Sequence, residues 1–151
     1  LVATLRFLPM AVGVWAFSKK EGKLLILPAL AIIIFNLNPI GRTVWFYSLL
    51  WLIPFLVWPF RDRFLIARSF GATFMAHSVG GAVWIWAFNL PAPVWIGLIP
   101  ITIMERSIFA LGISASYILG NNILAHLSSK KLLPAGIEID KKLTLSFLRK
   151  A

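Results

Sequence analysis

The chain alternates long apolar runs with short polar clusters, a pattern that predicts helices surrounded by apolar material. Five runs are strongly hydrophobic: residues 3–17, 24–38, 43–60, 64–88 and 107–127. A sixth run, residues 91–104, is shorter, contains prolines and ends at Glu105 and Arg106. Because a helix needs about 20 residues to cross ~30 Å of hydrocarbon, we expect this run to be re-entrant, interfacial or a compressed helix. The pattern predicts an all-α, polytopic membrane protein with five visible transmembrane helices.

The composition supports this interpretation. The 151 residues are 60% hydrophobic and include seven tryptophans, which leaves too few polar residues to cover a soluble domain. Without a cysteine, the chain has no disulfide, thiolate metal site or cysteine nucleophile. It begins with Leu1 rather than Met, and one further span before Leu1 would give a six-helix layout with both ends in the cytoplasm.

The net charge of +10 would indicate nucleic-acid binding in a soluble protein. Here the basic residues lie at the ends of apolar runs, where they set membrane orientation. The loops "SKKEGK" and "FRDRF" and the basic tail share one side if residues 91–127 cross once. We therefore expect no nucleic-acid partner, a multi-pass location in the cell membrane and a cytoplasmic C-terminus.

Two parts are expected along the chain: a transmembrane bundle over residues 1–128 and a basic tail over residues 129–151. The tail carries too many charges to span a bilayer. Its alternating apolar residues favour a short interfacial segment or a cytoplasmic strand, and its lysines are suited to contact anionic membrane lipid.

Polar residues within the fourth run are the first candidates for a site, because polar groups in hydrocarbon need partners. Thr73 and His77 share a helical face with Trp84 in "TFMAHSVGGAVWIWAF". Beside them runs a stripe of small residues that predicts close approach of another helix: Ala72, Ala76 and Gly80. His77 is a hydrogen-bonded packing residue, a ligand donor or a proton-relay group.

The last run repeats this design. Glu105 lies on the same helical face as a second set of small residues, Gly112, Ser116 and Gly120, and Arg106 follows it. Glu105 and Arg106 either form an ion pair at the start of a helix or contact a substrate. The tryptophans near span ends form an interfacial belt or stack on a ligand. The candidate ligand-binding residues are Thr73, His77, Trp84, Trp86, Trp95, Glu105 and Arg106.

Catalytic signatures are missing from the sequence. There is no HExxH, GxSxG or P-loop motif, and only five acidic residues. A haem between His77 and His126 is disfavoured because the two residues lie at about 20 Å and about 6 Å from the expected cytoplasmic surface. We expect no catalytic residue, no metal and no cofactor.

Three segments carry a resemblance to a known group: "NPIGRTVWFYSLLWLIPF" (38–55), "RSFGATFMAHSVGGAVW" (68–84) and "WIGLIPITIMERSIFALGISASYILGN" (95–121). They resemble small archaeal membrane proteins that are similar to the S components, the substrate-binding subunits, of energy-coupling factor vitamin transporters. The resemblance implies a six-helix bundle that captures a vitamin-type small molecule from outside. It also implies partners, namely a scaffold subunit and two ATPases.

A second class of function fits the same features. In an accessory, non-catalytic subunit of a larger membrane complex, the stripes of small residues would be buried by partner helices and no ligand would bind. Both functions therefore remain open on the sequence.

Overall fold

The computed structural model describes residues 2–19, 21–134 and 136–146, although not the side chains of residues 2–6, 17 and 18. Over this range the chain is helical and forms no strand. It divides into two compact units, Leu1–Ala110 and Leu111–Ala151, and the division falls within the last long helix. Residues 147–151 of the expected tail, with Arg149 and Lys150, lie outside the described residues.

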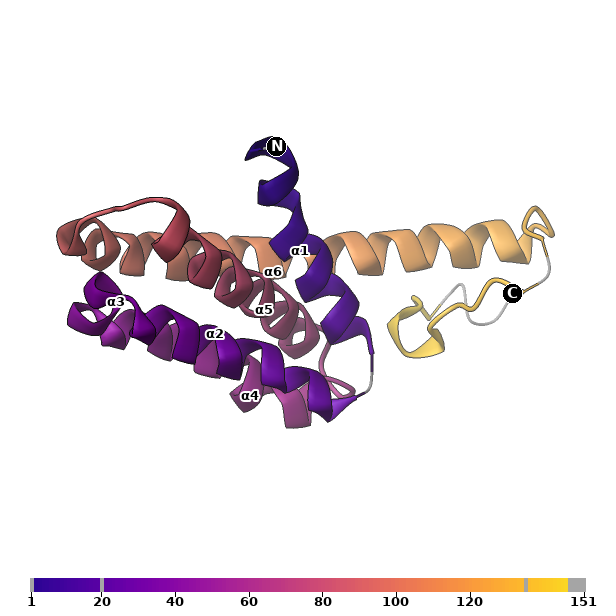
Figure 1. The fold of residues 1–151 in the computed structure, drawn as a ribbon. Coiled ribbons are helices and arrows are strands. Elements are labelled where there is room, and N and C mark those ends of the chain that lie inside the picture. Colours follow the sequence, from indigo (N-terminus) through magenta and orange to yellow (C-terminus); the bar gives the residue numbers. More distant parts are fainter. Residues whose placement is uncertain (1, 20, 135, 147–151) are drawn as a thin grey trace. The chain divides into compact units, whose positions relative to one another are not determined.

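The first unit is built around one central helix. Its elements before that helix are α1 (Val2–Ser18), η1 (Gly22–Leu25), α2 (Ile26–Leu37), α3 (Pro39–Thr43), η2 (Trp45–Leu52), α4 (Ile53–Val57) and η3 (Trp58–Phe60). The central helix is α5 (Leu65–Ala87), and α6 (Ala92–Ser129) follows it. Helices α1, α2 and α4 all pack against α5 (Figure 1).

Prolines and one asparagine explain where several elements begin. Asn38 caps α3, because its side-chain oxygen accepts hydrogen bonds from the backbone N–H groups of Ile40 and Gly41 at 2.9 and 3.4 Å. Pro39 follows at the first position of α3, where its missing N–H costs nothing. Pro54 lies in the first turn of α4. The expected span over residues 43–60 is therefore a series of short helical pieces.

The core of the first unit is aromatic. The Phe35 ring lies 5.8 Å from that of Tyr47, 5.1 Å from Trp51 and 5.2 Å from Trp95, measured between ring centroids. All four side chains are at most 2% exposed. This cluster joins α2, η2 and the first turn of α6, so it fixes the surroundings of α5 on one side.

Small residues let neighbours approach α5 closely. A Cβ added at Gly13 of α1 would lie 2.6 Å from the backbone nitrogen of Ala76, closer than any real contact allows. On another part of α5, a Cβ added at Gly81 would overlap the Trp51 ring. Glycine is therefore required at both points for the observed packing.

Arg61 has a structural role that its loop position does not suggest. Its side chain is 4% exposed and donates a hydrogen bond to the Lys19 carbonyl oxygen at 2.6 Å. The guanidinium carbon also lies 4.3 Å from the centre of the Trp58 ring. The turn before α5 is thereby tied to the end of α1.

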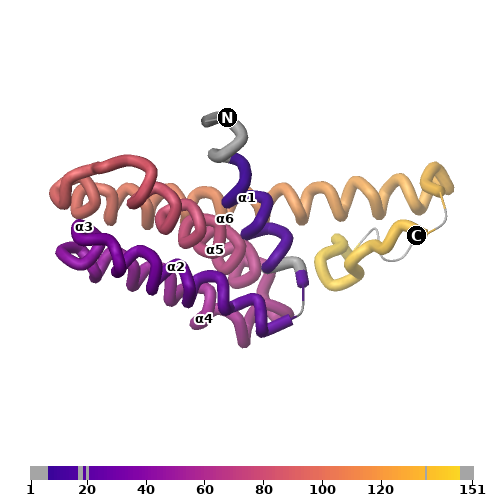
Figure 2. Tube along the Cα trace, viewed as in Figure 1, coloured from indigo at the N-terminus to yellow at the C-terminus, as the bar shows by residue number. Residues whose placement is uncertain are grey.

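The second unit consists of α6 from Leu111 onward and the C-terminal segment, which turns back toward the helix (Figure 2). The backbone has positive φ at Lys131 (57°) and at Gly136 (103°). Gly136 adopts this conformation without strain because it has no side chain. A short helix, η4 (Lys141–Leu143), follows. Asn121 and Asn122 of α6 hold this segment through hydrogen bonds to its backbone.

The expectation of five transmembrane helices is wrong. Among the described helices, only α6 is both long and apolar enough to cross a membrane. α5 has 23 residues, but Arg68, Thr73 and His77 dilute its hydropathy. Proline and turn residues keep the other apolar segments short. The run 91–104, apart from Pro91, belongs to the continuous helix α6, which has Pro100 inside it.

The surroundings of α6 are consistent with lipid contact. In its most apolar 18-residue stretch, 11% of the residues are buried, whereas the core helix of a soluble protein is mostly buried. Large apolar side chains are also exposed on the first unit, among them Ile33, Leu37 and Leu56. Extensive exposed apolar surface marks membrane or protein contact.

Candidate small-molecule pocket

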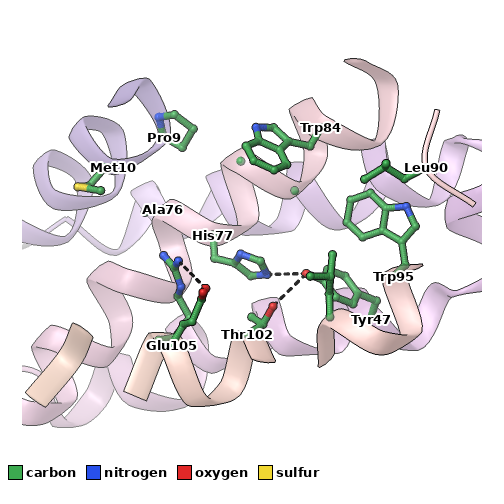
Figure 3. Close-up of a pocket in the computed structure, with 14 residues that line it drawn as sticks. Pro9, Met10, Tyr47, Ala76, His77, Trp84, Leu90, Trp95, Thr102 and Glu105 are labelled. Carbon is green, nitrogen blue, oxygen red and sulfur yellow. Dashed lines mark hydrogen bonds and ion pairs between the residues drawn. The ribbon is translucent and has the colours of Figure 1, made fainter. Parts of the chain in front are cut away.

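A cavity of about 270 Å³ lies in the first unit, where α5, η2 and the first turns of α6 meet, with Pro9 and Met10 of α1 at its edge (Figure 3). α5 contributes Ala76, His77, Gly80, Gly81 and Trp84, and α6 contributes Trp95, Leu98, Thr102, Glu105 and Arg106. Tyr47 of η2 and Leu90 complete the lining. Apolar walls with a few convergent polar groups are typical of small-molecule sites.

Tyr47 organises the polar groups of the cavity. Its hydroxyl lies 3.1 Å from Nε2 of His77 and 3.2 Å from Oγ1 of Thr102, and Figure 3 shows the three side chains facing one another. A tyrosine hydroxyl has one proton to donate and can accept as well, so it completes one chain from His77 to Thr102. Among the described residues, nothing bonds to Nδ1 of His77.

Charge is concentrated at one end of the cavity. Nη2 of Arg106 lies 3.6 Å from a carboxylate oxygen of Glu105, and the two side chains are 20% and 50% exposed. The guanidinium carbon of Arg106 also lies 4.8 Å from the centre of the Phe109 ring. The sequence left an ion pair and a substrate contact open for Glu105 and Arg106; the structure contains the pair and places both residues on the cavity.

Two residues of the lining carry buried N–H groups that have no acceptor in the described part of the chain, Nε1 of Trp95 and Nε of Arg106. An unsatisfied buried donor costs free energy, and such groups in native structures call for an explanation. A bound molecule with an acceptor near either group would recover a hydrogen bond.

Of the seven ligand-binding candidates, five line this cavity: His77, Trp84, Trp95, Glu105 and Arg106. Thr73 lies elsewhere, 6% exposed, with its hydroxyl donating to the Phe70 carbonyl at 3.1 Å. Trp86 is 56% exposed and donates its indole N–H to the Ile34 carbonyl at 3.1 Å. It ties α5 to α2 instead of facing the cavity.

The two stripes of small residues lie in different surroundings. Ala76 and Gly80 of α5 face α1, where Gly13 and Pro9 are their neighbours, and Ala72 packs beside buried Ala16 and Met75. On α6, Gly112 and Ser116 are exposed and Gly120 is half-buried. A Cβ added at Gly112 or Gly120 would meet no atom of the described structure within 4 Å.

Tyr47 and Thr102 were not among the candidates from sequence. The spacing of Trp95, Leu98, Thr102 and Glu105 follows one helical face, so the period through Glu105 was the signal for Thr102. Tyr47 carried no comparable signal, since it lies in the apolar run "WFYSLLW" (45–51). Only the folding of η2 against α5 brings its hydroxyl to His77.

No cluster of three or more histidine, cysteine, aspartate or glutamate side chains suited to a metal ion occurs in the described residues. Comparisons of the chain with protein-family models, with curated proteins and with solved structures gave no match. The cavity and its side chains therefore carry the functional argument.

Proposed function

We propose that this chain is a membrane-embedded binding subunit that holds a small, flat molecule for uptake and performs no catalysis. The observation that carries the proposal is the cavity of about 270 Å³ in which Tyr47 joins His77 to Thr102. Its volume is near the lower end for small-molecule pockets.

The lining indicates the chemistry of the ligand. Trp84 and Trp95 offer indole surfaces, which favour a planar, largely apolar body. Nδ1 of His77, the ring nitrogen that does not contact the Tyr47 hydroxyl, suits one hydrogen-bonding group of that body. At the charged end, Nε of Arg106 suits an acceptor, so a carboxylate or carbonyl on the molecule would lie there.

The proposed setting and partners rest on the sequence and on the composition of α6. We propose a location in the cell membrane, with α6 in the bilayer and the C-terminal segment in the cytoplasm. The resemblance to S components of energy-coupling factor transporters supports a vitamin-type ligand, with a scaffold subunit and ATPases as partners. The length and apolar composition of α6 support the membrane setting.

Mass spectrometry of the full chain, purified in detergent, tests the proposal by detecting co-purified small molecules. A vitamin panel is then titrated, with tryptophan fluorescence as the readout, because two of the seven tryptophans line the cavity. A chain that carries no small molecule and binds none from the panel would contradict the proposal.

Two variants link binding to the cavity. Tyr47→Phe removes the hydroxyl but keeps the ring, and His77→Ala removes the imidazole. Each should weaken ligand affinity by about tenfold or more, as expected for losing a buried hydrogen-bond partner. Trp86→Phe is the matched control, since Trp86 lies outside the cavity, and it should leave affinity unchanged. A lower melting temperature with unchanged affinity would make His77 a packing residue.

One observation favours a second function, that of an accessory subunit of a larger membrane complex. The exposed stripe Gly112, Ser116 and Gly120 on α6 is suited to close contact with a helix of another chain. Isolation of a stable complex whose formation depends on this stripe would favour this role. In that case Tyr47→Phe and His77→Ala should leave formation of the complex unchanged.

A further inference from the structure

Two adjacent asparagines fasten the C-terminal segment to α6. Asn121 accepts a hydrogen bond from the Asp140 N–H at 2.8 Å and donates one to the Asp140 carbonyl at 3.0 Å. Asn122 donates to the Leu143 carbonyl at 3.0 Å and accepts from the Leu145 N–H at 2.8 Å. Both side chains are less than a tenth exposed, so residues 140–145 have a fixed place on the last turns of the helix.

The segment held in this way is cationic and apolar on its exposed surface. Lys130, Lys131 and Lys141 are exposed, and Leu132 and Leu145 are 66% and 52% exposed. Two acids accompany them. Glu138 is exposed, while the Asp140 carboxylate accepts a hydrogen bond from the Lys142 backbone N–H at 2.9 Å.

The lysines begin where the uncharged part of α6 ends. Residues 107–129 contain no Asp, Glu, Lys or Arg, and Lys130 and Lys131 follow at once. α6 as a whole has 38 residues, roughly 57 Å at ~1.5 Å per residue, which exceeds the ~30 Å thickness of the hydrocarbon layer. The helix can therefore cross the bilayer while its last turns, with the segment held at Asn121 and Asn122, lie at the level of the lipid headgroups.

We propose that residues 130–146, held by Asn121 and Asn122, form an anchor at the membrane interface that binds anionic phospholipid. The exposed lysines attract acidic headgroups, and the leucines enter the boundary between headgroups and acyl chains. The asparagine clamp holds Lys141 and Leu145 against the last turns of α6. This inference rests on the proposed membrane setting and is independent of the cavity.

The absence of cysteine allows a direct test. A single cysteine in Leu145→Cys is labelled with an environment-sensitive fluorophore, and the full chain is reconstituted into vesicles of phosphatidylcholine with or without phosphatidylglycerol. In vesicles with phosphatidylglycerol, emission should shift to shorter wavelength and a lipid-borne quencher should quench it. Both effects should be smaller in phosphatidylcholine alone, and high salt should reduce them in vesicles with phosphatidylglycerol.

The lysines are exposed, so we expect substitutions there to leave the fold intact. Lys130→Gln, Lys131→Gln and Lys141→Gln together should abolish the dependence on phosphatidylglycerol, and the corresponding arginine variant should keep it. Asn121→Ala with Asn122→Ala should lower quenching, because the segment then leaves its fixed depth. Equal emission in both lipids, or an unchanged response of the glutamine variant, overturns the proposal.

Other outcomes separate this proposal from the function of the cavity. The labelled chain carries no added vitamin, so failure of ligand binding leaves the result unaffected. A chain that does not float with vesicles contradicts the membrane setting and this proposal together. Lysine-dependent binding to an acidic protein or an oligonucleotide, with no response to phosphatidylglycerol, also overturns the lipid assignment.

Discussion

α5 and α6 have the same spacing of small residues, but these residues are covered in α5 and mostly exposed in α6. In each helix, small residues recur every four positions: Ala72, Ala76 and Gly80 in α5, and Gly112, Ser116 and Gly120 in α6. The α5 stripe is covered by α1, which approaches to within van der Waals contact. The α6 stripe is exposed along most of its length. The spacing therefore gives a helix the capacity for close contact without fixing a partner.

The difference lies in what the neighbouring element offers. α1 brings Gly13 to Ala76 and Pro9 to Gly80, so small or compact residues meet on both sides of the contact. η2 brings the large Trp51 ring against Gly81, where the missing side chain makes room for it. A stripe of small residues is thus buried when the partner has the complementary shape.

The largest effect is expected where α5 receives Trp51. Trp51→Ala removes a side chain that is 0% exposed and leaves a cavity, which we expect to lower the free energy of unfolding by about 3–5 kcal/mol. The matched change on α6 is Leu119→Ala, because Leu119 is 64% exposed; it should cost much less. Urea unfolding in detergent, followed by circular dichroism, measures both. Equal losses would show that α6 is packed as tightly as α5.

A smaller effect is expected from adding one methyl group to each stripe contact. Alanine is the better helix former by up to about 1 kcal/mol, so Gly112→Ala, with no neighbour within 4 Å, should be neutral or slightly stabilising. At Gly13 the added carbon would lie 2.6 Å from the Ala76 backbone nitrogen. Overpacking of this kind costs about 1–3 kcal/mol and outweighs the gain in propensity.

The same unfolding measurement decides the sign at each glycine. Gly13→Ala should destabilise the chain, and Gly112→Ala should not. If Gly13→Ala is stabilising, the approach of α1 to α5 is looser than the structure has it, and the contrast between the two stripes fails.

Helices and their ends followed largely from sequence, because apolar runs and prolines act locally. The runs 3–17 and 64–88 correspond to α1 (Val2–Ser18) and α5 (Leu65–Ala87). The number of crossing helices did not follow. The run 43–60 is apolar throughout its length, but the backbone there divides into η2, α4 and η3. Pro100 also failed to interrupt α6, which joined two runs that the sequence separated.

The candidate site was predictable where polar residues lie in apolar surroundings. His77, Glu105 and Arg106 stand out in the sequence for this reason, and all three line the cavity. Tyr47 could not be found in this way, because its role depends on a contact across 30 residues of chain. Trp86 shows the reverse case: a tryptophan near a helix end indicates amphipathic surroundings but leaves open whether the ring faces a cavity or a carbonyl.

The smallest effect on stability is expected at Ser116. A substitution there tests whether the α6 stripe has a partner outside this chain. Ser116 is exposed, so Ser116→Leu should change the free energy of unfolding by less than about 0.5 kcal/mol. Ala76→Leu on α5 is the matched change and should be strongly destabilising, since Gly13 leaves no room beside Ala76. Cross-linking in native membranes before and after Ser116→Leu tests for association. For a binding subunit that does not use this stripe, we expect the same cross-linked species in both samples. Loss of a complex in Ser116→Leu, with retention in Ser116→Ala, would show that the α6 stripe is also a packing surface, with its partner supplied by another protein.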